Sequence, residues 1–427
     1  MHNARRPSLA VVATLAVGAL ALTACGDSGE PAQSGPVTLT VNVFGDNFSL
    51  PNDRSIYDEY ERTHPGVTIV ENRGDFGTHH QNIQARLTAG SGAADIEVIE
   101  VGQVAGYIGQ PDKFVNFRDH GVDSSQWTDA VIARASTADG KALIGLPTDI
   151  GGLAMCYRTD LFAAAGLPTD RAAVSALWPT WEDYIATGTR FGSKAPQGVK
   201  WFDAGGHVFT GILGNEKETF YDAEGKLIAE NNPAVRKAWD LTVKAIQAGQ
   251  SAALPEFSPE WNTGFQRGQF ATITCPAWMM GYIQGNAAET SGKWDIAKIP
   301  GGSGNWGGSY VTVPSQGKNT KAAVELAKWL TAPEQAVKLF KAIGNFPSQQ
   351  STWKDKEVAG FTSPFFSNAP AGTIFPESLE KAPAQVTGPE SGVIGNIFAA
   401  ALNSVEQGTD PNEAWRKTLG DIKAAAG

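Results

Sequence analysis

The sequence predicts an α/β protein with two or more lobes, built on a parallel sheet whose strands are joined by helices. The chain of 427 residues exceeds the roughly 100–200 residues that one domain usually holds. Apolar residues make up 42 % of it and charged residues only 18 %, a balance that favours sizeable cores and argues against disorder. Strand and helix patterns also alternate near the beginning of the chain, which is typical of α/β folds.

The alternation is clearest between residues 37 and 101. Short runs rich in β-branched and apolar residues predict strands at 37–44, 67–71 and 96–101. Helical spacing of apolar residues predicts helices at 55–63 and 81–89. Strands joined by helices of this length lie parallel in one sheet.

Capping residues indicate five further helices. The predicted caps are Thr180 (with Asp183), Asn232, Thr320, Thr331 (with Glu334) and Asp410. Gly249 and Gly344 are predicted to end two of these helices. Proline and glycine are scattered along this part of the chain, so we expect several short crossings between lobes and no long linker.

Small or polar residues follow each of the first three predicted strands. Ligands of open α/β sheets bind at the carboxyl ends of the strands. Asp46, Asn47, Asp75 and Gln103 are therefore candidate binding residues. A solvated turn is the alternative role for Asp46 and Asn47.

The N-terminus has the pattern of an export signal, with a predicted signal peptide at 1–24. Arg5 and Arg6 precede an apolar run of 16 residues, shorter than the ~20 needed to span a membrane. Residues 22–25 (LTAC) resemble the lipobox of bacterial lipoproteins, in which Cys25 carries the lipid; an ordinary cleavage site beside a chance cysteine is the alternative. Residues 25–36 are then a lipid-anchored flexible tether. The expected location is the extracellular face of the cell membrane, by either the general or the twin-arginine route.

The remaining cysteines, Cys156 and Cys275, form an even pair in an oxidising compartment, which predicts a disulfide; two separately buried thiols are the alternative. Neither has a metal-ligand spacing, and the adjacent His79 and His80 do not share a helix face, so we expect no metal site. The histidines are assigned to a capping or solvent role.

Charge and motifs exclude several classes of function. The net charge is −10 and no Lys/Arg run exceeds two residues, so a nucleic-acid partner is not expected. The G-x-G-x-x-G match at 302–307 precedes a strand pattern where a dinucleotide site needs a helix, and we expect no cofactor. The chain is not expected to be an enzyme. A secreted glycoside hydrolase is the open alternative, because 44 acidic residues can supply the carboxylate pair that such an enzyme needs.

Several segments in the middle of the chain resemble a known family. Residues 147–162 (PTDIGGLAMCYRTDLF), 165–168 (AGLP) and 179–183 (PTWED) resemble the signature of extracellular solute-binding proteins of sugar ABC importers, the maltose-binding-protein-like family 1. Residues 273–278 (ITCPAW), 305–314 (NWGGSYVTVP) and 322–330 resemble further family segments in the same order. The cysteine-containing variants look most like actinobacterial proteins for β-linked oligosaccharides such as cello-oligosaccharides.

This resemblance implies a two-lobed periplasmic-binding-protein fold with mostly parallel sheets, flanking helices and hinge crossings between the lobes. The implied N-terminal lobe is 37–102 plus 298–345, and the C-terminal lobe is 103–297 plus 346–427. It further implies a monomer that holds a small oligosaccharide in the cleft between the lobes and delivers it to the transmembrane subunits of an ABC permease. Gln103 departs from the family, which often has an acidic or aromatic residue after the third strand.

Sugar binding requires flat aromatic faces beside carboxylates and amides. Among the 12 tryptophans, Trp278 and Trp306 stand at predicted strand ends or glycine-rich turns, and Gly307 and Gly308 adjoin Trp306. Asp149 lies where the chain is expected to cross between lobes. These five residues complete the predicted sugar site, with packing as the alternative role of the tryptophans and hinge capping that of Asp149. The tryptophans on helical patterns, which are Trp181, Trp239, Trp329 and Trp415, are assigned to the core or to lobe surfaces.

Overall fold

The computed structural model describes residues 35–49 and 53–426. The predicted signal peptide, Cys25 and all but the end of the tether therefore lie outside the described residues. From Val37 onward the chain forms one compact unit. No helix in the described part of the chain is long and apolar enough to cross a membrane.

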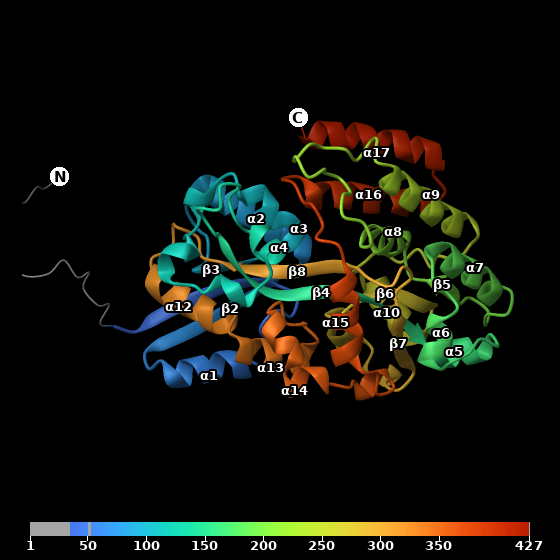
Figure 1. Cartoon of the computed structure of the whole chain (residues 1–427), viewed down its shortest axis with the longest axis horizontal. Coiled ribbons are helices and arrows are strands. Elements are labelled where there is room, and N and C mark those ends of the chain that lie inside the picture. The colour runs from blue at the N-terminus through green and yellow to red at the C-terminus, as the bar shows by residue number, and fades with distance from the viewer. Residues whose placement is uncertain (1–34, 50–52, 427) are drawn as a thin grey trace, which may run out of the picture. The chain divides into compact units, whose positions relative to one another are not determined.

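Eight strands of the described residues are hydrogen-bonded into one sheet, in the order β2-β1-β3-β8-β4-β6-β5 with β7 paired to β4. The strands are β1 (Val37–Phe44), β2 (Val67–Gly74), β3 (Ile96–Glu100), β4 (Gly145–Arg158), β5 (Lys200–Phe202), β6 (Phe270–Pro276), β7 (Trp294–Lys298) and β8 (Asn305–Thr312). Two groups of strands flank the middle of the sheet: β1, β2 and β3 on one side, and β5, β6 and β7 on the other. Figure 1 shows β4 and β8 side by side between these two strand groups.

The parallel sheet predicted from the first strands is confirmed, because β1 pairs in parallel with both β2 and β3. The expectation of mostly parallel sheets is wrong for the whole molecule. β8 runs antiparallel to β3 and β4, and β4 runs antiparallel to β6 and β7. The physical reason is that β4 and β8 serve both strand groups as connecting strands, and each returns against its neighbours instead of following a crossover helix.

The helices follow the same chain order. Those of the first half are α1 (Ser55–Thr63), α2 (Phe76–Ala89), α3 (Val101–Val104), α4 (Asp129–Ala133), α5 (Thr159–Ala164), α6 (Arg171–Ser175), α7 (Trp181–Gly192) and α8 (Gly205–Leu213). Those of the second half are α9 (Pro233–Gln247), α10 (Pro259–Arg267), α11 (Met279–Asn286), α12 (Thr320–Leu330), α13 (Pro333–Ile343), α14 (Lys356–Ala359), α15 (Ala371–Lys381), α16 (Ser391–Glu406) and α17 (Pro411–Ala426).

Three of the five predicted caps are confirmed. Thr180 and Asp183 form a reciprocal capping box at α7, Asn232 caps α9, and Asp410 accepts from the first backbone N–H groups of α17. The other two are wrong. Thr320 is the first residue of α12, and its hydroxyl donates to Gly317.

The Thr331 hydroxyl donates back to the Ala327 carbonyl of α12, 2.9 Å away, and α13 begins at Pro333. Proline at the first helical position has no N–H group, so this helix start needs one cap fewer. The predicted end of the helix at Gly344 is confirmed by its left-handed backbone.

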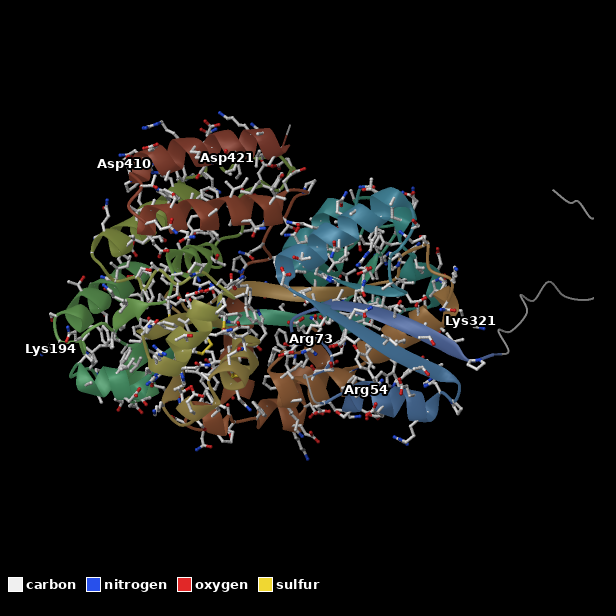
Figure 2. The ribbon with its side chains drawn as sticks, turned by 180° about the vertical axis from the view of Figure 1, so that it is seen from behind. Arg54, Arg73, Lys194, Lys321, Asp410 and Asp421 are labelled. Atoms are coloured by element: carbon white, nitrogen blue, oxygen red, sulfur yellow. A yellow bond between two sulfur atoms is a disulfide. The ribbon has the colours of Figure 1, made fainter. Side chains whose placement is uncertain are left out.

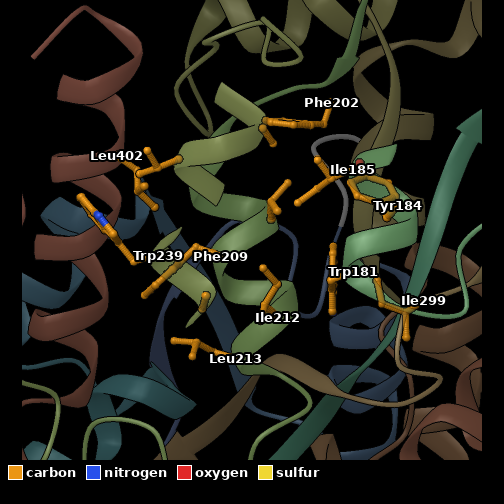
Figure 3. Close-up of a cluster of buried hydrophobic side chains, with 14 of the residues drawn as sticks. Trp181, Tyr184, Ile185, Phe202, Phe209, Ile212, Leu213, Trp239, Ile299 and Leu402 are labelled. Atoms are coloured by element: carbon orange, nitrogen blue, oxygen red, sulfur yellow. The ribbon is translucent and has the colours of Figure 1, made fainter. Parts of the chain in front are cut away.

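Three buried clusters of the described residues form the cores. One gathers β1, β3, α1 and α2 with later residues such as Phe117 and Leu146. The other two are built from the chain after residue 152, with Phe340 as a member from α13, and Figure 3 shows part of the larger one. Residues between 104 and 146 thus contribute to the same core as β1 and β3.

The predicted disulfide is present. Cys156 of β4 and Cys275 of β6 are bonded, with Cα atoms 5.4 Å apart, and both side chains are fully buried. The two residues lie diagonally across the antiparallel pair, because Cys156 is in register with Ile273 and Cys275 with Ala154. Figure 2 draws the bond in yellow.

Candidate functional site

The candidate site lies along the antiparallel pair of β4 and β8, at the segment that we call the β4–β8 crossing. Their pairing is irregular between Pro147 and Gly152. A Cβ atom added at Gly308 would lie 2.7 Å from the Asp149 carbonyl oxygen, and Gly308 has a φ of +116°. Gly307, with a φ of +81°, lies against the Trp278 indole nitrogen. Gly308 therefore lets β8 approach the Asp149 backbone closely, and Gly307 lets it approach the Trp278 indole. As a result, Trp306 and Asp149 lie in the same region of the molecule.

Trp278 and Trp306 contact each other at this point. Their ring centroids are 5.5 Å apart at 73°, and the Trp278 indole N–H donates to the Trp306 carbonyl at 3.2 Å. All 12 tryptophans fall within the described residues, and eight of them are buried. The half-buried ones are Trp278, Trp306, Trp329 and Trp353.

The other two half-buried tryptophans pack elsewhere. Trp329 lies edge-on to Tyr60 at 5.2 Å, and the Trp353 indole donates to Pro347. The assignment of the helical tryptophans to core or lobe surface is confirmed, because Trp181, Trp239 and Trp415 are buried. The tryptophan pair at the β4–β8 crossing thus combines partial exposure with mutual contact.

Polar residues near the ends of β1 and β3 and within β4 lie around Ser309 of β8. The Asn47 amide donates to the Ser309 hydroxyl at 3.5 Å, and Glu100 of β3 is in register with Ser309. Thr148 donates its hydroxyl to the Asp149 carboxylate at 2.7 Å and contacts the Ser309 carbonyl at 3.0 Å. The structure therefore brings together two predicted site residues, Asn47 and Asp149, with one that the sequence analysis missed, Glu100.

Burial dominates the electrostatics of this polar group. Loss of solvent and, to a smaller extent, the nearby Asp149 charge raise the pKa of Glu100 to about 7, against the Gly102 N–H that donates to its carboxylate. Burial also raises the pKa of Asp149 to about 6, against the hydrogen bond from Thr148. The side-chain oxygen Oδ1 of Asn47 and the Arg134 Nε atom are buried without a hydrogen-bond partner among the described residues. Such atoms are costly unless a ligand or water satisfies them.

Glu100 is not among the predicted site residues, because its strand was predicted to run to residue 101 and Gln103 was the candidate that followed it. In the structure β3 ends at Glu100 itself. The Glu100 N–H donates to Nε2 of His80 at 3.1 Å, and the other ring nitrogen of His80 contacts the Phe76 carbonyl at 2.8 Å. This pattern requires a neutral ring that accepts at Nε2 and donates at Nδ1, in agreement with a burial-lowered pKa of about 4.

The capping or solvent role expected of the two histidines is therefore wrong. His79 and His80 are both buried, and His79 contacts the Val98 carbonyl at 2.7 Å. They tie α2 to β3, so that His80 positions the strand end that carries Glu100. An acidic residue at a predicted strand end was the available signal.

The remaining predicted site residues have other partners. Asp46 pairs with Arg73 at 2.5 Å near the end of β2, where Figure 2 labels Arg73. Asp75 caps α2 by accepting from the Thr78 N–H at 3.0 Å, which holds the pKa of Asp75 below its ordinary value. Gln103 lies against Gly392 of α16, since a Cβ atom there would be 2.3 Å from the Gln103 amide nitrogen.

A second polar group, also missed, lies behind Trp306. The His207 ring centroid is 4.9 Å from that of Trp306. Nδ1 of His207 is hydrogen-bonded to Asp203, and Nε2 is 3.4 Å from the Glu256 carboxylate. Burial lowers the pKa of His207, but the two carboxylates outweigh burial and raise it to about 10. The buried ring is thus an imidazolium ion held between two carboxylates.

The chain belongs to the bacterial extracellular solute-binding proteins, whose family model matches residues 55–363. This confirms the family and the fold predicted from residues 147–162 and the later segments. Among curated proteins, the chain is similar to the arabinooligosaccharide-binding protein of Bacillus subtilis (strain 168), with 25 % identity over 368 residues that cover 79 % of each chain.

Two solved structures are similar over most of their length. A crystal structure of an extracellular solute-binding protein of family 1 is 41 % identical, with a TM-score of 0.79, over 92 % of this chain and 100 % of that one. The ABC transporter associated binding protein of B. animalis subsp. lactis Bl-04, solved in complex with beta-1,6-galactobiose, is 19 % identical with a TM-score of 0.75, over 90 % of this chain and 97 % of that one.

Proposed function

We propose that this chain is the substrate-binding component of an ABC importer, which captures an oligosaccharide between its lobes and delivers it to a membrane permease. The observation that carries the proposal is that an aromatic side chain and a group of polar residues lie close together along β8. Trp306 offers an aromatic face, and Ser309, three residues later, is the centre of the Asn47–Glu100–Asp149 polar group. A sugar presents the complementary surfaces, which are a C–H face and a rim of hydroxyls.

The two carboxylates suit hydroxyl recognition. With pKa values of about 6 and 7, Asp149 and Glu100 are partly protonated near neutral pH. A carboxylate accepts hydrogen bonds from hydroxyls, and a protonated carboxyl group also donates one. The pair can therefore satisfy hydroxyls in both directions.

Closure of the lobes supplies the signal to the permease. α3 contributes to the first core and α16 to another, and the two helices meet at Gly102 and Gly392, where a Cβ atom on Gly102 would be 3.6 Å from the Gly392 Cα atom. A ligand shifts an open–closed equilibrium by its difference in affinity for the two forms. An oligosaccharide that contacts groups from both cores favours the form in which this contact is made.

The proposed ligand class is a β-linked oligosaccharide such as a cello-oligosaccharide, supported by the family variants around Cys156 and Cys275. An arabino-oligosaccharide is the second ligand class, supported by the curated relative. Calorimetric titration with cellobiose, cellotriose, xylobiose, arabinobiose, β-1,6-galactobiose and maltose tests both. Binding to none of these sugars by the folded protein contradicts the proposal.

Alanine variants test the placement of the site. Trp278→Ala and Trp306→Ala each remove a face of ~100 Å², worth about 2.5 kcal/mol at 25 cal/mol/Å². Asp149→Ala removes a charged acceptor worth about 1.5–3 kcal/mol. We expect each change to weaken binding ten- to a hundredfold. Trp329→Ala is the matched control, because Trp329 is half-buried against Tyr60 and away from the crossing. If all three site variants bind within twofold of the parent, the site is misplaced.

The Glu100–Asp149 pair also permits a test of the hydrolase alternative. Hydrolysis of a glycosidic bond requires one carboxyl group with a raised pKa as the acid and a second, ionised carboxylate. Glu100, with a pKa of about 7, and Asp149, with a pKa of about 6, are the candidates for these two roles. Incubation with cello-oligosaccharides followed by chromatography should return them intact. Shorter products that disappear in an Asp149→Asn variant would favour the hydrolase.

We further propose that the protein is a monomer anchored at the extracellular face of the membrane by a lipid on Cys25. The support for the anchor is the sequence pattern at 9–25 alone, and the support for the monomer is the family resemblance alone. Cys25→Ser protein should leave the membrane fraction or remain unprocessed, with its fold unchanged. Correctly processed Cys25→Ser protein that still sediments with membranes lacking the permease contradicts the anchor.

A further inference from the structure

A loop between α9 and α10 exposes an aromatic side chain in a strained conformation. Phe257 is 45 % exposed and has a φ of +60°. Ala253, four residues earlier, also has a positive φ, of +53°. A bulky side chain in the left-handed region is a genuine outlier, and such residues cluster at ligand clamps and other functional sites.

The Phe257 ring extends the tryptophan pair. Its centroid is 6.4 Å from that of Trp278, and the two planes are inclined by only 30°. On its other sides it meets Trp261 at 5.5 Å and Tyr282 at 5.4 Å. These distances are within the 4.5–7 Å range of aromatic contacts, so Phe257 belongs to the same aromatic group as the site tryptophans.

The loop is also held against the other tryptophan through charge. The preceding residue, Glu256, lies 3.4 Å from His207, whose ring packs on Trp306. The loop thus reaches Trp278 through the Phe257 ring and Trp306 through Glu256 and His207. An imidazolium–carboxylate contact fixes its position without covering the Phe257 ring.

We propose that Phe257 is a third sugar-binding face, which selects oligosaccharides of three or more residues over disaccharides. This inference rests on the proposed function. The two tryptophan rings are nearly perpendicular, so they present faces in two directions, and the Phe257 ring continues the direction of Trp278. A disaccharide is satisfied by the tryptophans and the polar group around Ser309, whereas a longer chain reaches Phe257 and covers its exposed ring.

The test uses the full-length protein and two glycine variants. Phe257→Gly removes the ring and relieves the strain, because glycine tolerates a positive φ. Ala253→Gly relieves strain in the same loop without removing a ring, and is the matched control. Each protein is titrated calorimetrically with cellobiose, cellotriose and cellotetraose, and with arabinobiose, arabinotriose and arabinotetraose.

We expect Phe257→Gly to weaken binding of the tri- and tetrasaccharide about tenfold and of the disaccharide less than threefold. Ala253→Gly should bind every length within twofold of the parent. Equal affinities of Phe257→Gly and parent at every length, or an equal loss at every length, overturn the inference while the proposed function stands. A parent protein that binds none of the six sugars overturns the proposed function, and the inference with it.

Discussion

Two aromatic groups of this protein contain the same kinds of residue and differ in what surrounds them. Around Trp201, the rings of Phe162, Trp178, Tyr184 and Phe191 lie at 5.2–5.8 Å and are all buried. Around Trp306 lie Trp278, half-buried, and His207, an imidazolium between carboxylates.

The difference lies in the backbone that carries the rings. In the first group helices and strands cover each ring on every side, and Figure 3 shows Tyr184 and Trp181 packed within this core. In the second group the rings stand where β4 and β8 cross and where β6 ends. Aromatic residues alone therefore do not mark a binding site; the site that we propose combines them with strand ends and buried charges.

Among the variants that test this comparison, Trp201→Ala is expected to have the largest effect on the free energy of folding. Removing a fully buried indole costs about 3–5 kcal/mol of folding free energy, because the cavity collapses only in part. Thermal unfolding should show a large drop in melting temperature, with sugar affinity of the folded protein retained. Trp306→Ala should do the reverse. A Trp201→Ala variant as stable as Trp306→Ala would break the distinction between the two groups.

The disulfide beneath the site should have the next largest effect. The Cys156–Cys275 bond closes a loop of 119 residues and lies in the core against which Trp278 packs. Replacing both cysteines by alanine is expected to cost about 2–4 kcal/mol, seen in thermal unfolding without reductant. Thiol titration of the denatured, non-reduced wild-type protein should find neither of these two cysteines free. Two reactive thiols would show that the bond is absent in solution.

The pH dependence of stability gives a further test of the region around Trp306, through the nearby Asp149. Its pKa in the folded protein, about 6, lies above the ordinary value of 3.8. Its contribution to stability is therefore fully present below pH ~4 and is lost as the pH rises through 6, a change of at most about 3 kcal/mol. Asp149→Asn lacks this loss, so parent and variant should diverge in melting temperature between pH 4 and 7, in favour of the variant at higher pH.

The melting temperatures of parent and Asp149→Asn must be compared with each other because His80 also titrates in this pH range. Its lowered pKa of about 4 gives the opposite slope in the same window, since its contribution to stability is lost as the pH falls from 6.5 toward 4. This slope is common to parent and variant and cancels between them. Parallel curves for parent and Asp149→Asn would mean that Asp149 titrates as an ordinary exposed carboxylate.

The smallest effect is expected from Asp75→Ala, which tests a residue that the structure removes from the aromatic and polar groups. Loss of this N-cap should cost about 1 kcal/mol in thermal unfolding. Affinity for the best sugar should stay within twofold of the parent in calorimetry. A tenfold loss of affinity would return Asp75 to the site and extend the polar group beyond Ser309.

Features coded over a few neighbouring residues could be predicted from the sequence. β1 and α1 have the predicted bounds, and the capping box at Thr180 and the cap at Asp410 are present. Strand alternation and caps depend on side chains two to four positions apart, which a sequence displays directly. The disulfide followed from cysteine number and compartment, and the exposure of the Trp278–Trp306 pair from the glycines and strand ends beside it.

The tertiary structure decided which of the predicted residues lie together. Asn47 and Asp149 meet at Ser309, whereas Asp46, Asp75 and Gln103 contact Arg73, Thr78 and Gly392. Glu100 and His207 reach the region of Ser309 and Trp306 only through pairings between segments that are far apart in the sequence. Such contacts depend on the crossing of β4 and β8, which sets residues some 160 positions apart side by side. A local pattern carries no record of that approach, because its free energy comes from burial and charge between segments rather than from conformational preference within one.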